Sequence, residues 1–451
     1  MEIKKDKRAT LGLKIGAVLV AAGGSVGLGN IWRFPYVLGE GGGAAFLIVY
    51  IGFILLLGLP IMLAELSLGR FTRRNVFGAF ERIDKRWGSC GYFAVLTVTL
   101  LMGFYYVVSG WTLDYFFSSV SGALTHEHGA EGYTLLFESI ISNPVRPIIF
   151  AGLCLLITHT VVALGVEKGI ERFSKVLMPL LFVMLIVLSV NSLLMPGRDA
   201  ALKFLFTPDF SKLSSEVILQ ALGQAFFSLS LGVGAHITYG SYFSEKANLG
   251  SSAIQITVID TMVALLAGVM IFPAVFSFPA LSHEAGPSLV FITLPTIFES
   301  LPMSMLWSSL FFALLVIAAI TSAISLHEVA TAFFIEEFKL KRQWGAAITS
   351  SLSAVLMVFA SLSLTGVEWG SILGRTLFDW LDYITANTLM PLIAMASATL
   401  VGWRMSEKSL HDQLTNGGEN RFRVFKVLRF LLRYVSPIIL LLLMLSNLHI
   451  F

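Results

Sequence analysis

Residues 23–30 read Gly23-Gly24-Ser25-Val26-Gly27-Leu28-Gly29-Asn30, and this stretch decides the fold. It lies inside an apolar run from about Leu11 to Leu38, which is long enough to cross a bilayer. Each glycine costs a helix about 1 kcal/mol relative to alanine, so the four glycines predict a break. At membrane depth, unwound backbone is tolerated only where it is buried in protein or lines a cavity. Its free carbonyls suit a cation and its free N–H groups suit a carboxylate, so the stretch predicts a binding site inside a membrane.

The composition of the whole chain agrees with a membrane location. The chain has 451 residues, of which 56% are hydrophobic and 13% are charged, whereas about 25% of a soluble protein is charged. A basic start at residues 1–9 precedes the first apolar run, but that run is too long for a signal peptide, so we expect a transmembrane helix there. The net charge of +3 is small and says little about partners, and no nucleic-acid-binding patch is visible in the sequence. The two cysteines lack metal-ligand spacing and no catalytic motif is present, so we expect no enzyme.

Apolar segments of spanning length occur throughout the chain and predict about eleven transmembrane helices. They lie near 11–39, 44–69, 90–121, 147–166, 176–195, 217–243, 253–278, 303–338, 345–364, 376–403 and 427–448. A shorter apolar segment near 287–301 predicts a re-entrant extracellular hairpin.

Lysine and arginine gather in alternate loops, which sets the expected orientation. The loops after the second, fourth, eighth and tenth helices are basic, whereas 125–143 carries three Glu and no Lys or Arg. The positive-inside rule then places residues 1–10 and the loop 404–426 in the cytoplasm, and an odd number of helices places Phe451 outside. We expect a multi-pass protein of the cell inner (plasma) membrane.

A second break is predicted where Phe227-Ser228-Leu229-Ser230-Leu231-Gly232-Val233-Gly234 interrupts the sixth span. If the first and sixth helices are equivalent, the chain has two five-helix halves of opposite orientation. The expected fold is therefore an all-α integral membrane protein with a 5+5 inverted repeat and discontinuous helices 1 and 6. The halves are residues 11–195 and 196–403, and a last helix occupies 427–451.

The residues around the first break closely resemble a signature of the neurotransmitter:sodium symporters. The match begins with Ser25-Val26-Gly27-Leu28-Gly29-Asn30-Ile31-Trp32-Arg33-Phe34-Pro35-Tyr36 and continues, in order, through both halves. Its further parts are 41–44, 65–70, Tyr105-Tyr106, 223–230 and 291–295. The length resembles the bacterial amino-acid branch of that family, which includes leucine and multi-hydrophobic amino-acid transporters. The resemblance implies sodium-coupled symport by alternating access.

The resemblance implies two sodium ions, each held by oxygen atoms, the ligands that a hard cation prefers. The residues of the second sodium site would be Gly23, Val26, Ala318, Thr321 and Ser322. Those of the first would be Ser25, Asn30, Ser228 and Asp260, together with the substrate carboxylate. Taken alone, the adjacent hydroxyls of Thr321 and Ser322 would be interpreted as ordinary helix-packing groups.

Asp260 is the most telling single residue, because it is an acid within an otherwise uncharged apolar segment. A carboxylate at the bilayer centre costs about 2.5 kcal/mol or more, so it is a functional candidate. The family usually has Asn here, and its chloride-dependent members hold chloride nearby, at the counterparts of Tyr50, Gln224, Ser228, Asp260 and Ala264. We therefore expect Asp260 to ligate sodium and to supply the negative charge, so that no chloride is required.

The resemblance also implies a site for a zwitterionic amino acid. Its carboxylate would meet the N–H groups of Gly27 and Gly29 at a helix N-terminus and the hydroxyl of Tyr106. Gly27 stands where monoamine transporters carry Asp, which favours an amino acid. Carbonyls around Ser25, Phe227 and Ser230 would hold the amine. The side-chain pocket would consist of Met102, Tyr106, Phe227, Val233, Ser322 and Leu326, which suits a hydrophobic or aromatic amino acid, although each position alone is also typical of a helix core.

Two gates follow from the resemblance. The outer gate would pair Arg33 with Asp382 above Phe227. The inner gate would pair Arg8 with Glu336 near Tyr242, although the family usually has Asp at position 336 and Trp at position 11. Two further predictions concern buried polar residues: Glu65 caps the broken sixth helix, and His236 is a packing residue.

Other functions stay open from the residues alone. A proton-coupled amino-acid transporter would use Asp260 as its proton site, and sodium dependence of uptake distinguishes the two. A non-transporting membrane sensor or channel is the alternative from another class. The bilayer is the expected environment, and no obligatory protein partner is predicted.

Overall fold

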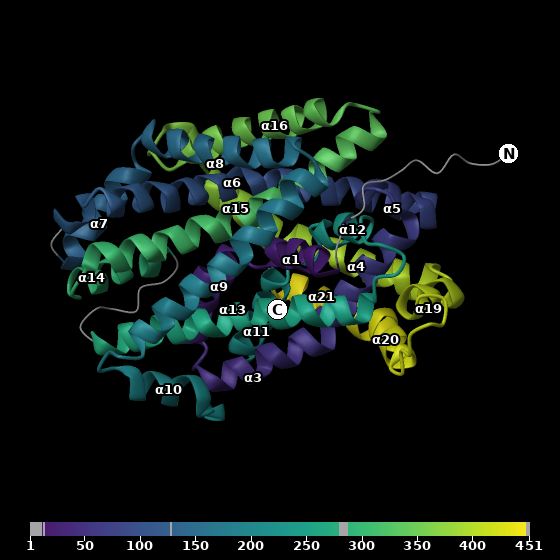
Figure 1. Cartoon of the computed structure of the whole chain (residues 1–451), viewed down its shortest axis with the longest axis horizontal. Coiled ribbons are helices and arrows are strands. Elements are labelled where there is room, and N and C mark those ends of the chain that lie inside the picture. Colours follow the sequence, from purple (N-terminus) through teal and green to yellow (C-terminus); the bar gives the residue numbers. More distant parts are fainter. Residues whose placement is uncertain (1–10, 12–13, 127–128, 279–286, 448–451) are drawn as a thin grey trace.

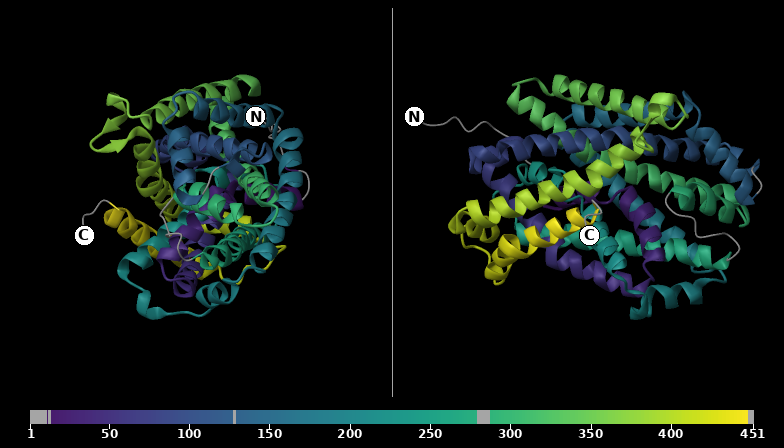
Figure 2. Two further views of the ribbon diagram at one scale, coloured as in Figure 1. Left: turned by 90° about the vertical axis from the view of Figure 1, so that its left-hand side faces the viewer. Right: turned by 180° about the vertical axis from the view of Figure 1, so that it is seen from behind.

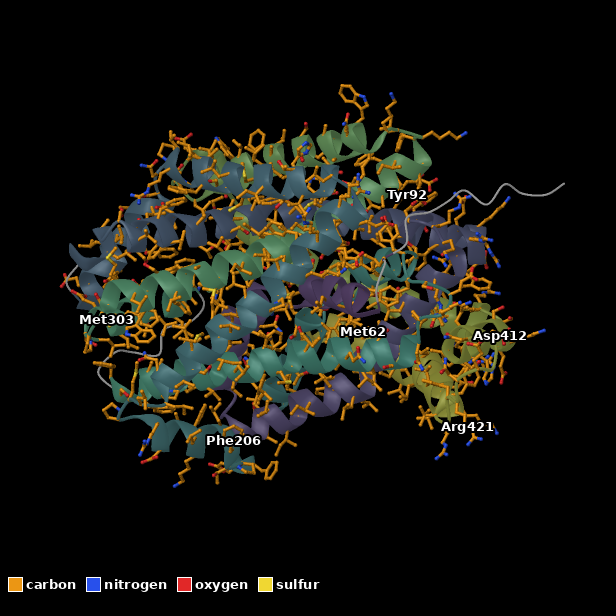
Figure 3. The ribbon with its side chains drawn as sticks, viewed as in Figure 1. Met62, Tyr92, Phe206, Met303, Asp412 and Arg421 are labelled. Carbon is orange, nitrogen blue, oxygen red and sulfur yellow. The ribbon has the colours of Figure 1, made fainter. Side chains whose placement is uncertain are left out.

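The computed structural model describes residue 11 and residues 14–126, 129–278 and 287–447, and it is almost entirely helical (Figure 1). Its long helices run roughly along the longest axis of the molecule. The described residues contain nine helices that are long and apolar enough to cross a membrane, and ten if the bent pair Gly16–Ser25 and Gly29–Glu40 counts as one span. Met303 and Asp412 mark opposite ends of that axis (Figure 3).

The first five spans contain seven α-helices, several of them joined by short π-helical turns. They are α1 (Lys14–Ser25), α2 (Phe34–Glu40), α3 (Ala44–Phe53), α4 (Leu59–Thr72), α6 (Gly88–Val120), α8 (Arg146–Ala163) and α9 (Arg172–Ser192). The π-helical turns are η1 (Gly29–Arg33), η2 (Ile54–Gly58) and η5 (Val166–Glu171).

The remaining spans follow the same pattern. They are α11 (Ser215–Ser228), α12 (Ala235–Gly240), α13 (Leu249–Ser277), α15 (Ser304–Glu337), α16 (Arg342–Ser363), α17 (Leu377–Ile384), α18 (Met390–Thr399), α20 (Phe425–Phe430) and α21 (Ser436–Asn447). The turns η9 (Thr385–Leu389), η10 (Leu400–Arg404) and η11 (Leu431–Val435) lie within or at the ends of these spans.

Shorter elements connect the spans. The helices are α5 (Val76–Ile83), α7 (Gly129–Ile141), α10 (Arg198–Phe206), α14 (Leu294–Glu299) and α19 (Glu407–Thr415), with η3 (Lys85–Trp87), η4 (Ala123–His126), η6 (Phe210–Lys212), η7 (Leu289–Thr293) and η8 (Glu368–Gly370). The strands β1 (Ser371–Ile372) and β2 (Arg375–Thr376) pair antiparallel, with Ser371 opposite Thr376, at the edge of the bundle (Figure 2).

The sixth predicted span corresponds to α11 and α12, and neither helix is long enough alone to count among the nine. Residues 229–234 separate them, and Ser230, Gly232 and Gly234 have φ values of 49°, 76° and 77°. Glycine adopts this left-handed region without strain, which explains why the helix stops here. The structure therefore confirms that helices 1 and 6 are discontinuous in an all-α fold. The segment near 287–301 contains the short helix 289–299, whereas residues 279–286 lie outside the described part, so the hairpin stays a prediction.

The centre of the bundle is formed by α1, α6 and α15, which place the broken segments deep inside the protein. α15 packs against α6, α16, α1 and α9, and α1 also contacts α13. The backbones of α4 and α12 approach closely, since a Cβ on Gly240 would lie 2.9 Å from the Cα of Leu66. Small residues at helix contacts are typical of membrane bundles.

Candidate functional site

The first helix breaks at the predicted glycines. α1 ends at Ser25, the backbone bends through Val26 and Gly27, and the helical axis continues from Gly29 at an angle of 55°. Gly27 has no room for a side chain, because an added Cβ would overlap the hydroxyl of Ser322. The break thus leaves carbonyl and N–H groups facing neighbouring helices rather than lipid.

The residues predicted for the second sodium site meet between α1 and α15. The Ser322 hydroxyl donates to the carbonyl of Val26 at 3.0 Å and to that of Gly23 at 3.4 Å. Thr321 Oγ1 lies 3.1 Å from the Ala318 carbonyl, and an added Cβ on Gly23 would lie 3.7 Å from Thr321. Five oxygen atoms from two helices are therefore gathered in one region, with no competing charge among them.

The break in the sixth helix is stabilised by two buried polar side chains. Glu65 accepts a hydrogen bond from the Gly232 N–H at 3.1 Å. His236 Nε2 lies 2.8 Å from the Leu229 carbonyl, which can only accept. Both side chains satisfy backbone groups that a continuous helix would have paired internally. The predicted capping role of Glu65 is thus visible in the geometry, as is a packing role for His236.

Two serines join the breaks to each other. The Ser25 hydroxyl donates to the Leu229 carbonyl at 3.4 Å, and the Ser230 hydroxyl donates to the Gly24 carbonyl at 3.1 Å. Each break therefore supplies a donor to the other. Ser25 points at helix six and makes no hydrogen bond to Asn30 or Asp260, its predicted neighbours in the first sodium site.

The other predicted residues of that site form one polar cluster. Asp260 Oδ2 accepts from the Ser228 hydroxyl at 2.7 Å, and Asp260 Oδ1 accepts from Asn30 Nδ2 at 2.8 Å. Asn30 Nδ2 also donates to Ser228 Oγ at 3.0 Å, as does the Tyr50 hydroxyl at 3.1 Å. All four side chains are at most 1% exposed. Asn30 Oδ1 faces the other way and accepts from the Gly27 N–H at 3.0 Å.

Of the predicted chloride counterparts, Ser228 bonds Asp260 directly, and Tyr50 is connected to Asp260 through Ser228. Gln224 lies on the same helix as Ser228 and donates to the Gly29 carbonyl at 3.3 Å. Ala264 is fully buried one turn beyond Asp260 on α13.

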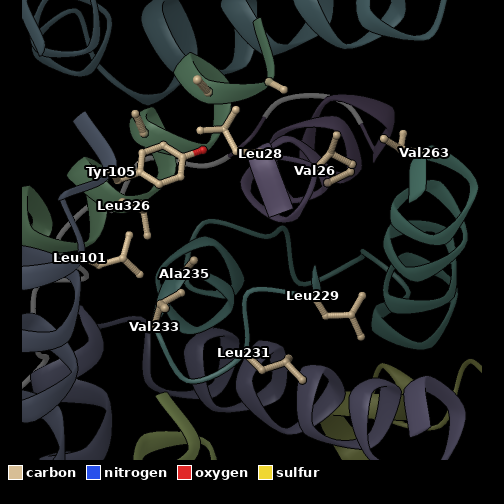
Figure 4. Packing of buried hydrophobic residues seen from close by; sticks show 14 of the residues in the cluster. Val26, Leu28, Leu101, Tyr105, Leu229, Leu231, Val233, Ala235, Val263 and Leu326 are labelled. Carbon is tan, nitrogen blue, oxygen red and sulfur yellow. The ribbon is translucent and has the colours of Figure 1, made fainter. Parts of the chain in front are cut away.

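The tyrosine pair on α6 points differently from the expectation. The hydroxyl of Tyr105, not that of Tyr106, lies next to Gly27, 3.3 Å from the position of an added Cβ. Figure 4 shows Tyr105 directing its hydroxyl towards Leu28. Both hydroxyls are buried without a hydrogen-bond partner in the structure. Successive residues of a helix point about 100° apart, and Tyr105 is the one that faces Gly27. The substrate contact expected of Tyr106 stays a prediction.

The same rotation applies one turn earlier on α6. Met102 accepts a hydrogen bond from Ser353 of α16, at 3.6 Å from its sulfur, so Met102 points away from the breaks. Leu101 instead points towards the region of Val233 and Leu326 (Figure 4). Leu101 is therefore the residue of this pair that faces Val233 and Leu326, and the pocket role of Met102 stays a prediction. Sequence adjacency in the Tyr105-Tyr106 pair hid this one-residue shift.

At the outer side of the breaks, Arg33 lies over the ring of Phe227, with 4.5 Å between Cζ and the ring centroid. No nitrogen of Arg33 comes within 4 Å of an oxygen of Asp382 among the described ion pairs. The resemblance implies a water-mediated pair of these two residues, and that pair stays a prediction. A cavity of about 550 Å³ adjoins this point; its lining includes Arg33, Phe227, Tyr383, Glu40, Glu216 and Asn447.

At the opposite side, Arg8 lies outside the described residues. Glu336 accepts hydrogen bonds from the backbone and side chain of Asn75 at 2.8 and 3.1 Å. Tyr242 donates to the buried carboxylate of Glu328 at 2.7 Å, and Arg342 pairs with the same carboxylate through both of its terminal nitrogens.

The pair of Glu328 and Arg342 was not predicted from the sequence. Glu328 is an acid inside the long apolar helix α15, which is the same signal that drew attention to Asp260. A search of the whole chain for acids inside apolar segments would have identified Glu328 as well.

Comparisons with known proteins agree on one family. The family model described as "Sodium:neurotransmitter symporter family" matches residues 8–144 and 141–451. The chain is similar to an uncharacterised sodium-dependent transporter, YhdH, of Bacillus subtilis, at 38% identity over 96% of each chain. It is also similar to the human sodium- and chloride-dependent taurine transporter, at 28% identity over 91% of this chain and 74% of the relative.

A solved structure extends the likeness to three dimensions. The crystal structure of MhsT in complex with L-phenylalanine superposes with a TM-score of 0.89. The two chains are 42% identical, and the match covers 98% of this chain and 100% of that one.

Proposed function

Because this chain belongs to the sodium:neurotransmitter symporter family, we propose that it imports a hydrophobic or aromatic L-amino acid together with sodium. As a member of this family it is a multi-pass membrane transporter and not an enzyme. The observation that carries the proposal is the buried cluster of Asn30, Ser228 and Asp260 beside two mutually bonded helix breaks. Such a site, with one carboxylate among neutral oxygens, suits a hard monovalent cation.

Two sodium ions fit the oxygen atoms present. The second site would use the carbonyls of Gly23, Val26 and Ala318 and the hydroxyls of Thr321 and Ser322, which already lie together. The first would use Asn30, Ser228 and Asp260, and Ser25 would join it after leaving the Leu229 carbonyl. Both sets are buried, so a bound ion would exchange its water shell for protein oxygens.

The amino acid would lie between the two breaks. The N–H groups of Gly27 and Gly29 and the hydroxyl of Tyr105 are the donors for its carboxylate, and carbonyls around Ser25, Phe227 and Ser230 would hold its amine. The apolar side of this site contains Leu101, Val233 and Leu326, with Ser322 and Phe227 at its ends. The solved complex of the related MhsT with L-phenylalanine supports a substrate of this class.

Chloride would not be required. Asp260 places a carboxylate in contact with Ser228, which itself bonds Tyr50, so a fixed negative charge lies where the expected chloride ligands meet. A second anion would be repelled by that charge in this buried site.

Transport would proceed by alternating access in the cell inner membrane, with the N-terminus in the cytoplasm and the C-terminus outside. Arg33 and Asp382 above Phe227 would form the outer gate, and Arg8, Glu336 and Tyr242 the inner one. The inward sodium gradient would drive uptake, with a membrane potential of 100 mV supplying about 2.3 kcal/mol per charge.

The test is equilibrium binding of the twenty amino acids to the purified protein by scintillation proximity, in sodium and in choline. We expect binding of phenylalanine, tryptophan, leucine or a similar amino acid in sodium only, and the same affinity when gluconate replaces chloride. Absence of any sodium-dependent ligand would refute the proposal. Binding that follows pH and not sodium would favour a proton-coupled transporter that uses Asp260.

A further inference from the structure

One side chain connects the first sodium site to the carboxylate site. Asn30 presents its carbonyl oxygen to the Gly27 N–H at 3.0 Å. It presents its amide nitrogen to Asp260 Oδ1 at 2.8 Å and to Ser228 Oγ at 3.0 Å. Asn30 is fully buried, so water does not compete for these bonds. The same amide group is therefore hydrogen-bonded to residues of both sites.

The orientation of this amide is fixed by chemistry. A backbone N–H can only donate, so Gly27 must face the oxygen of Asn30. The Asp260 carboxylate accepts at both oxygens, from Ser228 at one and from Asn30 at the other, so it must face the nitrogen. Oxygen and nitrogen of an amide are assigned from such networks, and here both ends give the same answer.

A sodium ion at the first site would require the opposite orientation of the Asn30 amide. A sodium ion needs oxygen ligands, and the Asn30 nitrogen, which carries two hydrogens, cannot serve. For Asn30 to ligate sodium beside Asp260 and Ser228, its amide must turn so that the oxygen faces the cluster. The nitrogen then faces the Gly27 N–H, and two donors oppose each other. Gly27 is left with a donor that needs a new acceptor.

We infer that Asn30 is a positioning residue that couples the two sites: turned one way it covers the Gly27 N–H, and sodium turns it so that this N–H becomes free for the substrate carboxylate. The inference rests on the proposed function and adds the side chain through which its two sites are coupled. Because such coupling is reciprocal, sodium at the first site favours amino-acid binding and the amino acid favours sodium.

Two other interpretations give different results. If Asn30 is only a sodium ligand, removing it weakens sodium binding and leaves sodium-free affinity for the amino acid unchanged. If Asn30 only caps the outer half-helix, as a side chain that reaches back to an N-terminal N–H does, its removal weakens amino-acid binding with or without sodium. Coupling alone predicts a gain of affinity when sodium is withheld.

The experiment measures equilibrium binding of L-phenylalanine, or of the best ligand from the screen above, to purified protein in choline and in sodium. The variant is Asn30→Ala, and Asn30→Ser is the second variant because its hydroxyl is one bond too short to replace the carbonyl oxygen. The matched control is Thr257→Ala, which removes a buried hydroxyl of α13 that donates to the sulfur of Met62 and lies outside both proposed sites. Thermal midpoints, with and without sodium, show that each variant is folded.

We expect Asn30→Ala and Asn30→Ser to bind the amino acid about tenfold more tightly than the wild type in choline, which is the effect of freeing one hydrogen bond for a charged group. The ratio of affinities in sodium and choline should collapse. Thr257→Ala should keep the affinities of the wild type in both choline and sodium. If neither Asn30 variant gains affinity in choline, the coupling role is wrong, whereas the proposed function fails only if the wild type shows no sodium-dependent binding at all.

Discussion

The hydroxyl of Ser228 donates to one oxygen of Asp260 at 2.7 Å, while the other oxygen of that carboxylate accepts from Asn30 at 2.8 Å. Asp260 is therefore bonded on both sides, by the broken sixth helix and by the broken first helix. A charge held between the two broken helices can act on both. The cluster contains no basic side chain, so the negative charge of Asp260 is available to a cation.

Replacing Asp260 by asparagine should make uptake weak and responsive to chloride, because the substitution removes the only fixed negative charge of the cluster while keeping its shape. We expect at least a tenfold fall in uptake in gluconate and partial recovery in chloride, measured in proteoliposomes with an inward sodium gradient. Thr257→Ala, on the same helix but bonded only to the sulfur of Met62, is the control and should behave as the wild type. Uptake by Asp260→Asn that ignores chloride would contradict the proposed origin of the charge.

Tyr105→Phe should weaken amino-acid binding about tenfold, whereas Tyr106→Phe should leave it nearly unchanged. The Tyr105 hydroxyl is the one beside Gly27, and a hydrogen bond to a charged carboxylate contributes about 1.5 kcal/mol or more. The two variants remove the same atom from neighbouring residues, so each is the control for the other. Isothermal titration in sodium measures the difference, and the reverse order of effects would restore Tyr106 to the site.

The sequence predicts the backbone of this site better than its side chains, and the reason is physical. Glycines and an intramembrane acid leave strong signals, because broken helix and buried charge are costly in lipid. The breaks at 26–27 and 229–234 and the meeting of Asn30, Ser228 and Asp260 therefore agree with expectation.

Rotation about a helix axis leaves no such signal. Tyr105 and Tyr106 have the same chemistry, and Leu101 and Met102 are both apolar, so only packing of α6 against α15 and α16 decides which of each pair faces the breaks. The direct contact of Arg33 with the Phe227 ring likewise depends on side-chain conformation that pattern alone does not specify.

Removing one partner of the Glu328–Arg342 pair should destabilise the fold strongly. Glu328 is fully buried and also accepts from Tyr242 at 2.7 Å, and an uncompensated buried charge costs about 3 kcal/mol or more. We expect Arg342→Gln, which leaves the Glu328 carboxylate unpaired, to lower the thermal midpoint clearly, and the double variant with Glu328→Gln to recover part of the loss. Arg86→Gln, in an exposed pair with Asp84, should leave the midpoint unchanged. A double variant less stable than Arg342→Gln would show that the two charges do not compensate each other.

Val233 should set the size of the preferred side chain. It lies in the turn between α11 and α12, is 1% exposed, and points towards the same region as Leu101 and Leu326 (Figure 4). A phenylalanine there would fill the space that a substrate ring needs, and overpacking costs about 1–3 kcal/mol. Val233→Phe should therefore lower the affinity for phenylalanine about tenfold relative to that for leucine or alanine, in competition binding at fixed sodium. Val233→Ala is the matched variant and should shift the preference towards tryptophan. If both variants keep the wild-type ranking of amino acids, the ring of the substrate does not lie against Val233.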